Sequence, residues 1–310
     1  MSKTVAGERA INLSSVLLCK KGGVIIPVSS GQEYDGKLDW ENFTKRYVNA
    51  YFWAVGKDMG CQIYGKDPIN MDSGNYLYEK QDLKIQGILP LSFCLFYNSL
   101  SDKDQGALGE GWNHTYEISL KEIPKKAAVV ITMGDGREVS YVRSLEGAYR
   151  PASGDAGELI AVENGFSYRD RNGLVCAFDR KGRLVHMSAG AGAGNHFLYD
   201  GKGRLLRAEN ETGWLQYVYN GENRLIHVCD HTGRKVDLKY QYGKLRWYTD
   251  AAGVCYEYDY NENGKLNRVC KPEEGVALKN EYDGANRVLR QTMPDGSVAE
   301  LRYDDKNNRT

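Results

Sequence analysis

The second half of the chain repeats one short unit, and this repetition constrains the fold more than any other feature. An aromatic residue followed by Asp, Asn or Gln recurs seven times, at steps of 20 to 22 residues. A fixed period of this size marks an architecture in which one supersecondary unit stacks on the next. The aromatic residues are Phe178, Tyr199, Tyr219, Tyr240, Tyr260, Tyr282 and Tyr303, and a Tyr-Asp pair stands at Asp200, Asp283 and Asp304.

Each unit has the pattern of a β-hairpin. The aromatic residue precedes a turn of the form Asp/Asn-x-x-Gly/Asn, whose first side chain can bond the backbone two residues on. The last turn residue tolerates positive φ, so we expect positive φ at Gly203 and Gly264. The Tyr240 unit is one residue shorter and needs a different turn. Between turns, residues such as Val236 and Leu238 alternate with polar ones, which is typical of half-buried antiparallel strands. We expect the tyrosines to form an aromatic ladder on one face.

These units resemble the YD repeats of Rhs proteins, wall-associated bacterial toxins and teneurins over about residues 166–310. Three further blocks, residues 67–79, 89–99 and 108–116, resemble the domain of unknown function that precedes the repeats in Rhs proteins. Residues 19–25 and 29–32 resemble the end of a PAAR-like domain, a domain similar to the spike tip of contractile secretion machines. The pre-repeat blocks contain Asp67, Pro68, Gly74, Asn75, Tyr97, Asn98, Gly111, Trp112 and His114.

The resemblance implies four regions: a PAAR-like remnant at 1–35, a helical linker at 36–66, a pre-repeat β domain at 67–165 and YD repeats at 166–310. The implied fold is mostly β, with antiparallel hairpin repeats in an open curved sheet, part of the hollow cocoon that encloses a toxic C-terminal domain in the family. No Rhs core motif and no toxin domain follow the repeats, so we expect a truncated shell. The family's self-cleaving aspartates have no counterpart in this sequence.

One helix is expected before the β regions. Apolar residues at helical spacing, among them Trp40, Phe43, Tyr47 and Tyr51, predict an amphipathic helix over residues 38–59. Such a helix can pack on the shell or bind a partner.

Composition limits the partners and the compartment. The 41 basic and 41 acidic residues balance, so no overall field favours nucleic acid or an anionic membrane. Seven scattered cysteines without a Cys-x-x-Cys motif indicate free thiols made in a reducing cytoplasm. No Sec signal peptide and no membrane span are evident. We expect cytoplasmic synthesis followed by secretion or surface display through a specialised system.

The most metal-like cluster is His227, Cys229, Asp230 and His231. All four are competent ligands, but His227 stands where other units carry Arg, Trp or His, which indicates a position for a large, partly exposed side chain. We therefore expect no metal and no cofactor.

No catalytic constellation stands out either. His114, beside Trp112, is expected to be packed and hydrogen-bonded rather than catalytic. The carboxylate pairs Glu273-Glu274 and Asp304-Asp305 fall in expected turns and are interpreted as solvated charges.

The sequence thus favours a non-enzymatic structural shell segment of an Rhs/YD-repeat polymorphic toxin, which encapsulates or presents a C-terminal effector. Its expected partners are the remainder of the shell, the toxin domain and a secretion-machine spike. The alternative is a cell-surface adhesion module that binds carbohydrate through Trp214, Tyr217, Trp247 and Tyr248, because aromatic faces stack on sugars. An enzyme is the third reading.

Overall fold

The computed structural model describes residue 69 and residues 74–303, apart from 102–105, 124–127, 145, 152–156 and 190–193, together with four short strands near the N-terminus. The chain divides into two units, Met1–Arg46 and Tyr47–Thr310. In the first unit, β1 (Thr4–Val5) pairs with β2 (Glu8–Arg9) and β3 (Leu17–Cys19) pairs with β4 (Gly23–Ile25). The helix expected over residues 38–59 lies outside the described residues.

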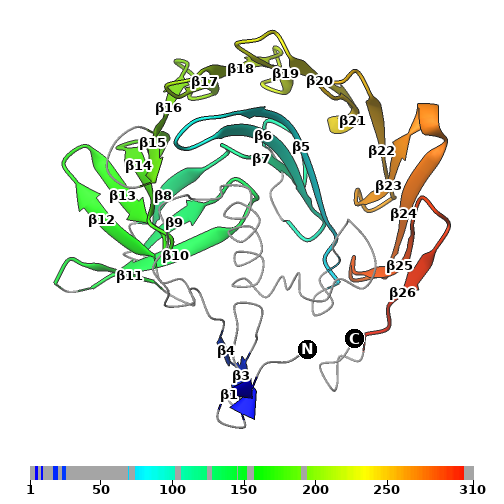
Figure 1. The fold of residues 1–310 in the computed structure, drawn as a ribbon, viewed down its shortest axis with the longest axis horizontal. Coiled ribbons are helices and arrows are strands. Elements are labelled where there is room, and N and C mark those ends of the chain that lie inside the picture. Colours follow the sequence, from blue (N-terminus) through cyan, green and yellow to red (C-terminus); the bar gives the residue numbers. More distant parts are fainter. Residues whose placement is uncertain are drawn as a thin grey trace. The chain divides into compact units, whose positions relative to one another are not determined.

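The second unit is built on one antiparallel sheet of fifteen strands, β12 to β26, in which each strand pairs with its neighbours in the sequence. The two end strands do not pair with each other, so the sheet is open, and it curves through a wide arc (Figure 1). This confirms the expected mostly β fold with a large open antiparallel sheet. The strands are β12 (Glu158–Val162), β13 (Gly165–Arg169), β14 (Leu174–Asp179), β15 (Leu184–Ala189), β16 (Gly194–Tyr199), β17 (Leu205–Glu209), β18 (Trp214–Tyr219), β19 (Leu225–Asp230), β20 (Lys235–Gln241), β21 (Lys244–Thr249), β22 (Cys255–Tyr260), β23 (Leu266–Lys271), β24 (Val276–Tyr282), β25 (Val288–Thr292) and β26 (Val298–Glu300).

Two smaller antiparallel sheets precede the long one in the sequence. The three-stranded sheet β5-β6-β7 lies inside the arc, against the concave face of the long sheet (Figure 1). The four-stranded sheet has the order β11-β10-β9-β8. The expected boundary between pre-repeat and repeat regions, at 165/166, falls within β13, and the long sheet starts one strand earlier, at β12. The strands are β5 (Leu77–Ile85), β6 (Leu91–Asn98), β7 (Trp112–His114), β8 (Ser119–Ile123), β9 (Ala128–Thr132), β10 (Glu138–Arg143) and β11 (Tyr149–Pro151).

The repeat turns follow from their sequence. Gly203 and Gly264 have φ of 83° and 76°, as predicted. In the shorter Tyr240 unit, Tyr242 and Gly243 have φ of 51° and 76°. Positive φ at both central residues is the signature of a two-residue type I′ hairpin turn, which confirms the expectation of a different turn there.

The repeat tyrosines form a ladder made by their hydroxyl groups. Each hydroxyl donates to the carbonyl of a Leu or Val at or next to the start of a strand, 14 to 16 residues earlier. Most of the rings lie beneath a basic side chain of the preceding unit, as Tyr219 lies beneath Arg204 at 5.0 Å. The hydroxyl bonds are Tyr199 to Leu184 (2.8 Å), Tyr219 to Leu205 (3.0 Å), Tyr240 to Leu225 (2.6 Å), Tyr260 to Leu245 (2.6 Å), Tyr282 to Leu266 (2.6 Å) and Tyr303 to Val288 (2.5 Å).

The strands bury one face and leave the other partly exposed. In β20, Val236 and Leu238 are buried while Lys235 and Lys239 are exposed. Each further unit adds such a half-covered face, so stacking the units builds a continuous core. Cys94, Cys176, Cys229, Cys255 and Cys270 are free thiols. Nor does the described part contain a helix with the length and apolar character needed to cross a membrane.

Candidate functional site

We call the contact surface between residues 74–116 and residues 197–303 the seam. Its centre is aromatic. The Trp112 ring centroid lies 5.1 Å from that of Tyr97 and 4.8 Å from that of Tyr258, and Tyr78 meets Tyr258 edge-on at 5.8 Å. The buried indole also donates from Nε1 to the hydroxyl of Tyr260 at 2.9 Å. Because that hydroxyl belongs to the tyrosine ladder, the pre-repeat sheet is bonded directly into the repeat pattern.

Backbone N–H groups at the bulges of the repeat strands donate to acceptors in the pre-repeat region. The register shifts at five of the repeat tyrosines, as between Val218 and Tyr219, so the next strand's first N–H can turn away from the ladder. The N–H of Leu225 donates to the carbonyl of Ala107 at 2.9 Å, and the N–H of Leu266 donates to the hydroxyl of Tyr97 at 2.9 Å.

A third bulge is capped in the same way by Gly74, whose carbonyl accepts from the N–H of Val288 at 2.9 Å. Gly74 has φ of 66°, and a Cβ there would stand 2.4 Å from the Cβ of Arg287 and 2.7 Å from the hydroxyl oxygen of Tyr303. Only glycine fits this conformation and this approach without displacing its neighbours. The Gly74 position is therefore shaped by its contact with the last described repeat.

Glu110 supplies a carboxylate to two repeat turns. Its Oε2 lies 2.9 Å from Nζ of Lys244, and its Oε1 lies 3.6 Å from Nζ of Lys265. Burial alone would raise the pKa of Glu110, but its bonds to both lysines and their charges outweigh burial and lower the pKa. Gly109 and Gly111 flank it with φ of 97° and 75°, so the loop can bend closely against the turns.

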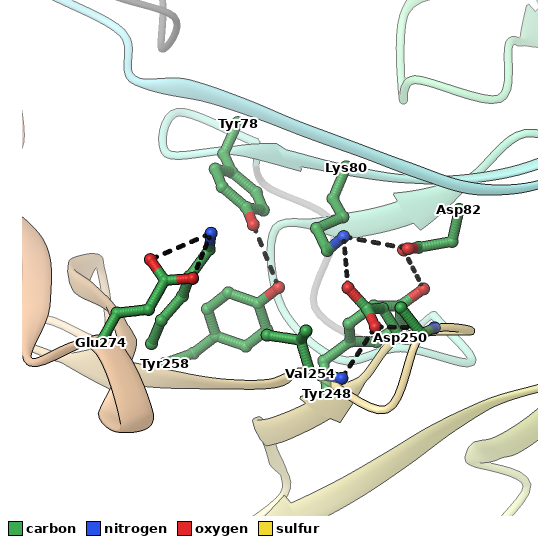
Figure 2. A network of polar contacts seen from close by, with 10 residues as sticks. Tyr78, Lys80, Asp82, Tyr248, Asp250, Val254, Tyr258 and Glu274 are labelled. Atoms are coloured by element: carbon green, nitrogen blue, oxygen red, sulfur yellow. Dashed lines mark hydrogen bonds and ion pairs between the residues drawn. The ribbon is translucent and has the colours of Figure 1, made fainter.

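A second charged cluster lies on the other side of the seam, on β5. Nζ of Lys80 is 2.9 Å from Asp82 and 3.4 Å from Asp250, and the hydroxyl of Tyr248 donates to Asp82 at 2.5 Å (Figure 2). Nζ also lies 4.3 Å from the ring centroid of Tyr256. Both carboxylate side chains are less than a tenth exposed.

The electrostatics of this cluster follow from its burial. Burial alone would lower the pKa of Lys80, but the bond to Asp82 and the charges of Asp82, Tyr256 and Asp250 outweigh it and raise the pKa. Burial, with the adjacent Asp82 carboxylate, raises the pKa of Tyr248 far above its usual range. The lysine is thus held as a cation and the tyrosine as a neutral donor, so the cluster forms a fixed polar clamp.

A cavity of about 550 Å³ opens beside the seam. It is lined by the loop that contains Gly106, by His114, and by the turns that carry Arg183, Arg204 and Arg224. Arg183 and Arg204 are paired with the aspartates of their own turns, while Arg224 donates to the carbonyl of Gly106 at 2.8 Å. The guanidinium groups at the cavity wall are therefore engaged within the chain.

Most of the described pre-repeat candidates lie at the seam or just behind it. Gly74, Tyr97, Gly111 and Trp112 are at the contact, as described above. The Oδ1 of Asn75 accepts from the Ser99 hydroxyl at 3.0 Å, which ties the first two blocks together. Asp67, Pro68 and Asp304 are outside the described residues.

Asn98 has a local role, whereas His114 packs against a repeat residue. Asn98 Oδ1 accepts from the N–H of Leu100 at 3.0 Å. His114 is buried, with its ring centroid 5.3 Å from that of Tyr217 and 5.9 Å from that of Phe93. Its surroundings are those of a packed aromatic core.

The histidine-rich stretch does not come together as one ligand set. His227 Nδ1 pairs across the strands with Asp237 at 2.8 Å, whereas Asp230 caps its own turn and binds Arg234. Within the described ranges, no three His, Cys, Asp or Glu side chains gather closely enough to hold a metal ion.

The four aromatic residues considered for sugar binding do not share an exposed face. Tyr217 and Tyr248 are at most 1% exposed. Trp214 and Trp247 are partly exposed, and each lies beneath an arginine side chain, at 4.8 Å and 5.5 Å respectively. This arrangement offers no continuous aromatic platform to a sugar.

Sequence reasoning missed Lys80, Asp82 and Asp250, and it did not assign a role to Glu110. A signal for Asp250 was present. Turn aspartates such as Asp200, Asp230 and Asp283 have Arg four residues later, whereas Asp250 is followed at that distance by Val254. A turn carboxylate that lacks its local cation points to a cation from elsewhere in the chain.

Comparisons with known proteins place matches on both regions that meet at the seam. Residues 66–141 match the family described as "Domain of unknown function (DUF6531)". The chain is 21% identical to "Probable deoxyribonuclease RhsB" of Dickeya dadantii (strain 3937), over 80% of this chain and 22% of that protein. It is 24% identical to "tRNA nuclease WapA" of Bacillus subtilis (strain 168), over 77% of this chain and 11% of that protein. The chain is therefore similar to proteins named RhsB and WapA over most of its own length.

Among solved structures, the crystal structure of TcdB2-TccC3-Cdc42 is similar at 10% identity, with a TM-score of 0.31, over 87% of this chain and 19% of that chain. The crystal structure of TcdB2-TccC3-TEV has a TM-score of 0.33 at 11% identity, over 87% and 18%.

The names of the curated relatives correct one expectation. We expected a chain with no enzymatic function, and the relatives that it matches over more than three quarters of its length are named nucleases. The sequence offered no sign of this because the nuclease names describe whole proteins, of which the chain spans between 11% and 22% in the curated relatives it matches.

Proposed function

We propose that the chain is a shell segment of an Rhs/YD-repeat toxin, in which the pre-repeat sheet braces the repeat sheet from its concave face. The single observation that carries this proposal is the seam. Trp112 is bonded into the tyrosine ladder, and three pre-repeat acceptors cap repeat bulges. A continuous sheet pairs its backbone groups internally, so it can form a wall.

The shell would encapsulate or present a C-terminal effector. Since the curated relatives are named deoxyribonuclease and tRNA nuclease, we infer that the effector of the whole toxin cleaves nucleic acid. The partners would be the remaining shell and the effector. Residues 1–35 would connect the segment to a secretion-machine spike, and export would use a specialised secretion system.

The test is to isolate the protein from its source by an antibody against residues 74–303 and to measure its mass, its peptides and its nuclease activity. The proposal predicts a product several times larger than 34.8 kDa, with further repeat peptides and cleavage of DNA or tRNA. A product of about 34.8 kDa that leaves both nucleic acids intact would contradict it.

A further inference from the structure

We propose that repeat turns lacking one partner of the usual ion pair determine which repeats the pre-repeat sheet contacts. Because the repeat surface is nearly periodic, these unpaired charges fix the register of the pre-repeat sheet on it. The inference rests on the charges and contacts of the seam and stands independently of the toxin assignment. Its partner surface is the chain's own loop and strand, through Glu110 and Lys80.

In a repeat turn that contains both Asp and Arg, the two charges pair within the turn. In the Asp200 turn, Oδ1 accepts from the N–H groups of Lys202 and Arg204 at 2.9 Å, and Oδ2 accepts from Nε of Arg204 at 2.7 Å. The turn at Asp283 has the same arrangement with Arg287. These turns present no unmatched charge to a docking segment.

Three consecutive units lack the turn carboxylate. They carry Asn220, Gln241 and Asn261, where complete turns have Asp. Asn keeps the backbone bonds, as in the 2.9 Å bond from the N–H of Arg224 to Asn220 Oδ1, but it brings no charge. The cations of these units meet the pre-repeat loop instead. Arg224 donates to the carbonyl of Gly106, and Lys244 and Lys265 pair with Glu110.

The turn at Asp250, at the other end of the strands of the long sheet, keeps its carboxylate but lacks the arginine. Asp250 caps its turn through the N–H groups of Ala252 and Val254 at 3.0 Å and 2.9 Å. Val254 stands where the turn of Asp230 has its arginine, so Asp250 Oδ2 has no local cation of that kind. Lys80 takes this place from β5 (Figure 2).

Together, the two defects admit one register. If the pre-repeat sheet moved back by one unit, Lys80 would face Asp230, which Arg234 already pairs at 2.6 Å. If it moved forward by one unit, Lys80 would face the turn of Glu274, which pairs with Lys271 at 3.1 Å. Each shift would leave a charge in the seam without its own partner, which is costly for partly buried groups.

A forward shift would also misplace the loop carboxylate. Glu110 would then lie between Lys265 and Arg287, and Arg287 is already bound to Asp283 at 2.8 Å. Selecting one register by unmatched charges in all others is the logic by which periodic interfaces obtain specificity.

The test reverses the loop charge in the full chain and reads docking from amide hydrogen exchange at Leu225 and Leu266, whose N–H groups are bonded to pre-repeat acceptors. We expect Glu110→Lys to speed exchange at both amides at least about tenfold. The triple variant with Lys244→Glu and Lys265→Glu should restore exchange to within about twofold of the original.

Glu222→Lys is the matched control, since Glu222 is an exposed residue of a neighbouring turn, and it should leave both amides unchanged. Unchanged exchange in Glu110→Lys, or a triple variant no slower than the single one, would overturn the proposal. If Glu110→Lys does not fold, the near-isosteric Glu110→Gln replaces it, with an expected increase of about threefold to fivefold.

Restoring the carboxylate of one turn tests whether its absence determines the docking register. Asn261→Asp places an acid beside Lys265 while keeping the turn's oxygen acceptor. In that background, the effect of Glu110→Gln should fall to about half or less, because Lys265 then has a local partner. If Glu110→Gln speeds exchange as much in the Asn261→Asp background as in the original protein, Glu110 stabilises docking whether or not the turn lacks its carboxylate.

Discussion

Replacing Tyr260 with Phe tests the joint between the tyrosine ladder and the pre-repeat sheet. The hydroxyl of Tyr260 donates to the carbonyl of Leu245 at 2.6 Å and accepts from Nε1 of Trp112 at 2.9 Å. Leu245 and Trp112 are at most 1% exposed. The substitution leaves a buried donor and a buried acceptor unpaired, each at a cost of about 1–3 kcal/mol. We expect Tyr260→Phe to lower the free energy of unfolding by about 2–6 kcal/mol.

Tyr199→Phe is the matched control. Tyr199 has the same ladder position, and its hydroxyl donates to the carbonyl of Leu184 at 2.8 Å. The buried carbonyl of Leu184, left unpaired, should cost about 1–3 kcal/mol, which is about half of the loss expected for Tyr260→Phe. Urea unfolding of both variants, followed by circular dichroism, measures the difference. A loss in Tyr260→Phe no greater than that in Tyr199→Phe would refute the role of this hydroxyl in joining the two sheets.

Three further outcomes follow from the repeat turns. Gly203→Val should lower the free energy of unfolding by about 1–3 kcal/mol because φ is 83° there. The control Gly201→Val, within the same turn, should lower it clearly less. Equal melting temperatures for the two variants would contradict the turn assignment. Tyr242 has φ of 51° and is 94% exposed, so Tyr242→Asn should raise the melting temperature by relieving about 0.5–1 kcal/mol of strain. Burial alone would raise the pKa of Asp283, but its backbone bonds and Arg287 outweigh it and lower the pKa below 3.8. This stabilisation is present above about pH 4 and is lost as the pH falls through the folded-state pKa. Asp283→Asn should therefore flatten the acid limb when the urea midpoint is measured from pH 6 to pH 2. An unchanged acid limb would argue against the Asp283–Arg287 pair.

Local sequence rules predicted the repeat sheet well. The period placed the hairpins, and turn chemistry predicted the positive φ of Gly203 and Gly264 and the different turn at Tyr242. The aromatic ladder was expected from the tyrosine spacing, but not its bonding to carbonyls about 15 residues earlier. At Tyr199, Tyr219, Tyr240, Tyr260 and Tyr282 the bond accompanies a register shift, a feature of strand pairing that periodicity does not specify.

The seam was less accessible to sequence reasoning. Its ion pairs join residues far apart in the chain, with separations of 134 residues for Glu110 to Lys244 and 170 residues for Lys80 to Asp250. Periodicity describes each unit but not which unit meets which loop. The resemblance to Rhs proteins drew attention to the blocks around Gly74, Tyr97 and Trp112, and the four-region division at 1–35, 36–66, 67–165 and 166–310 remains a prediction.

Zero-length carbodiimide cross-linking followed by peptide mass spectrometry tests the central claim most directly, since it joins only lysines and carboxylates that are in contact. Both partners of the Glu110–Lys244 pair are about one-third exposed, so the reagent can reach them. The pair Lys271–Glu274, within one turn, serves as the internal positive control. The account predicts an isopeptide link between Glu110 and Lys244 in monomeric protein. Recovery of the Lys271–Glu274 link without any link from Glu110 to Lys244 or Lys265 would contradict the docking of the pre-repeat sheet on the repeats.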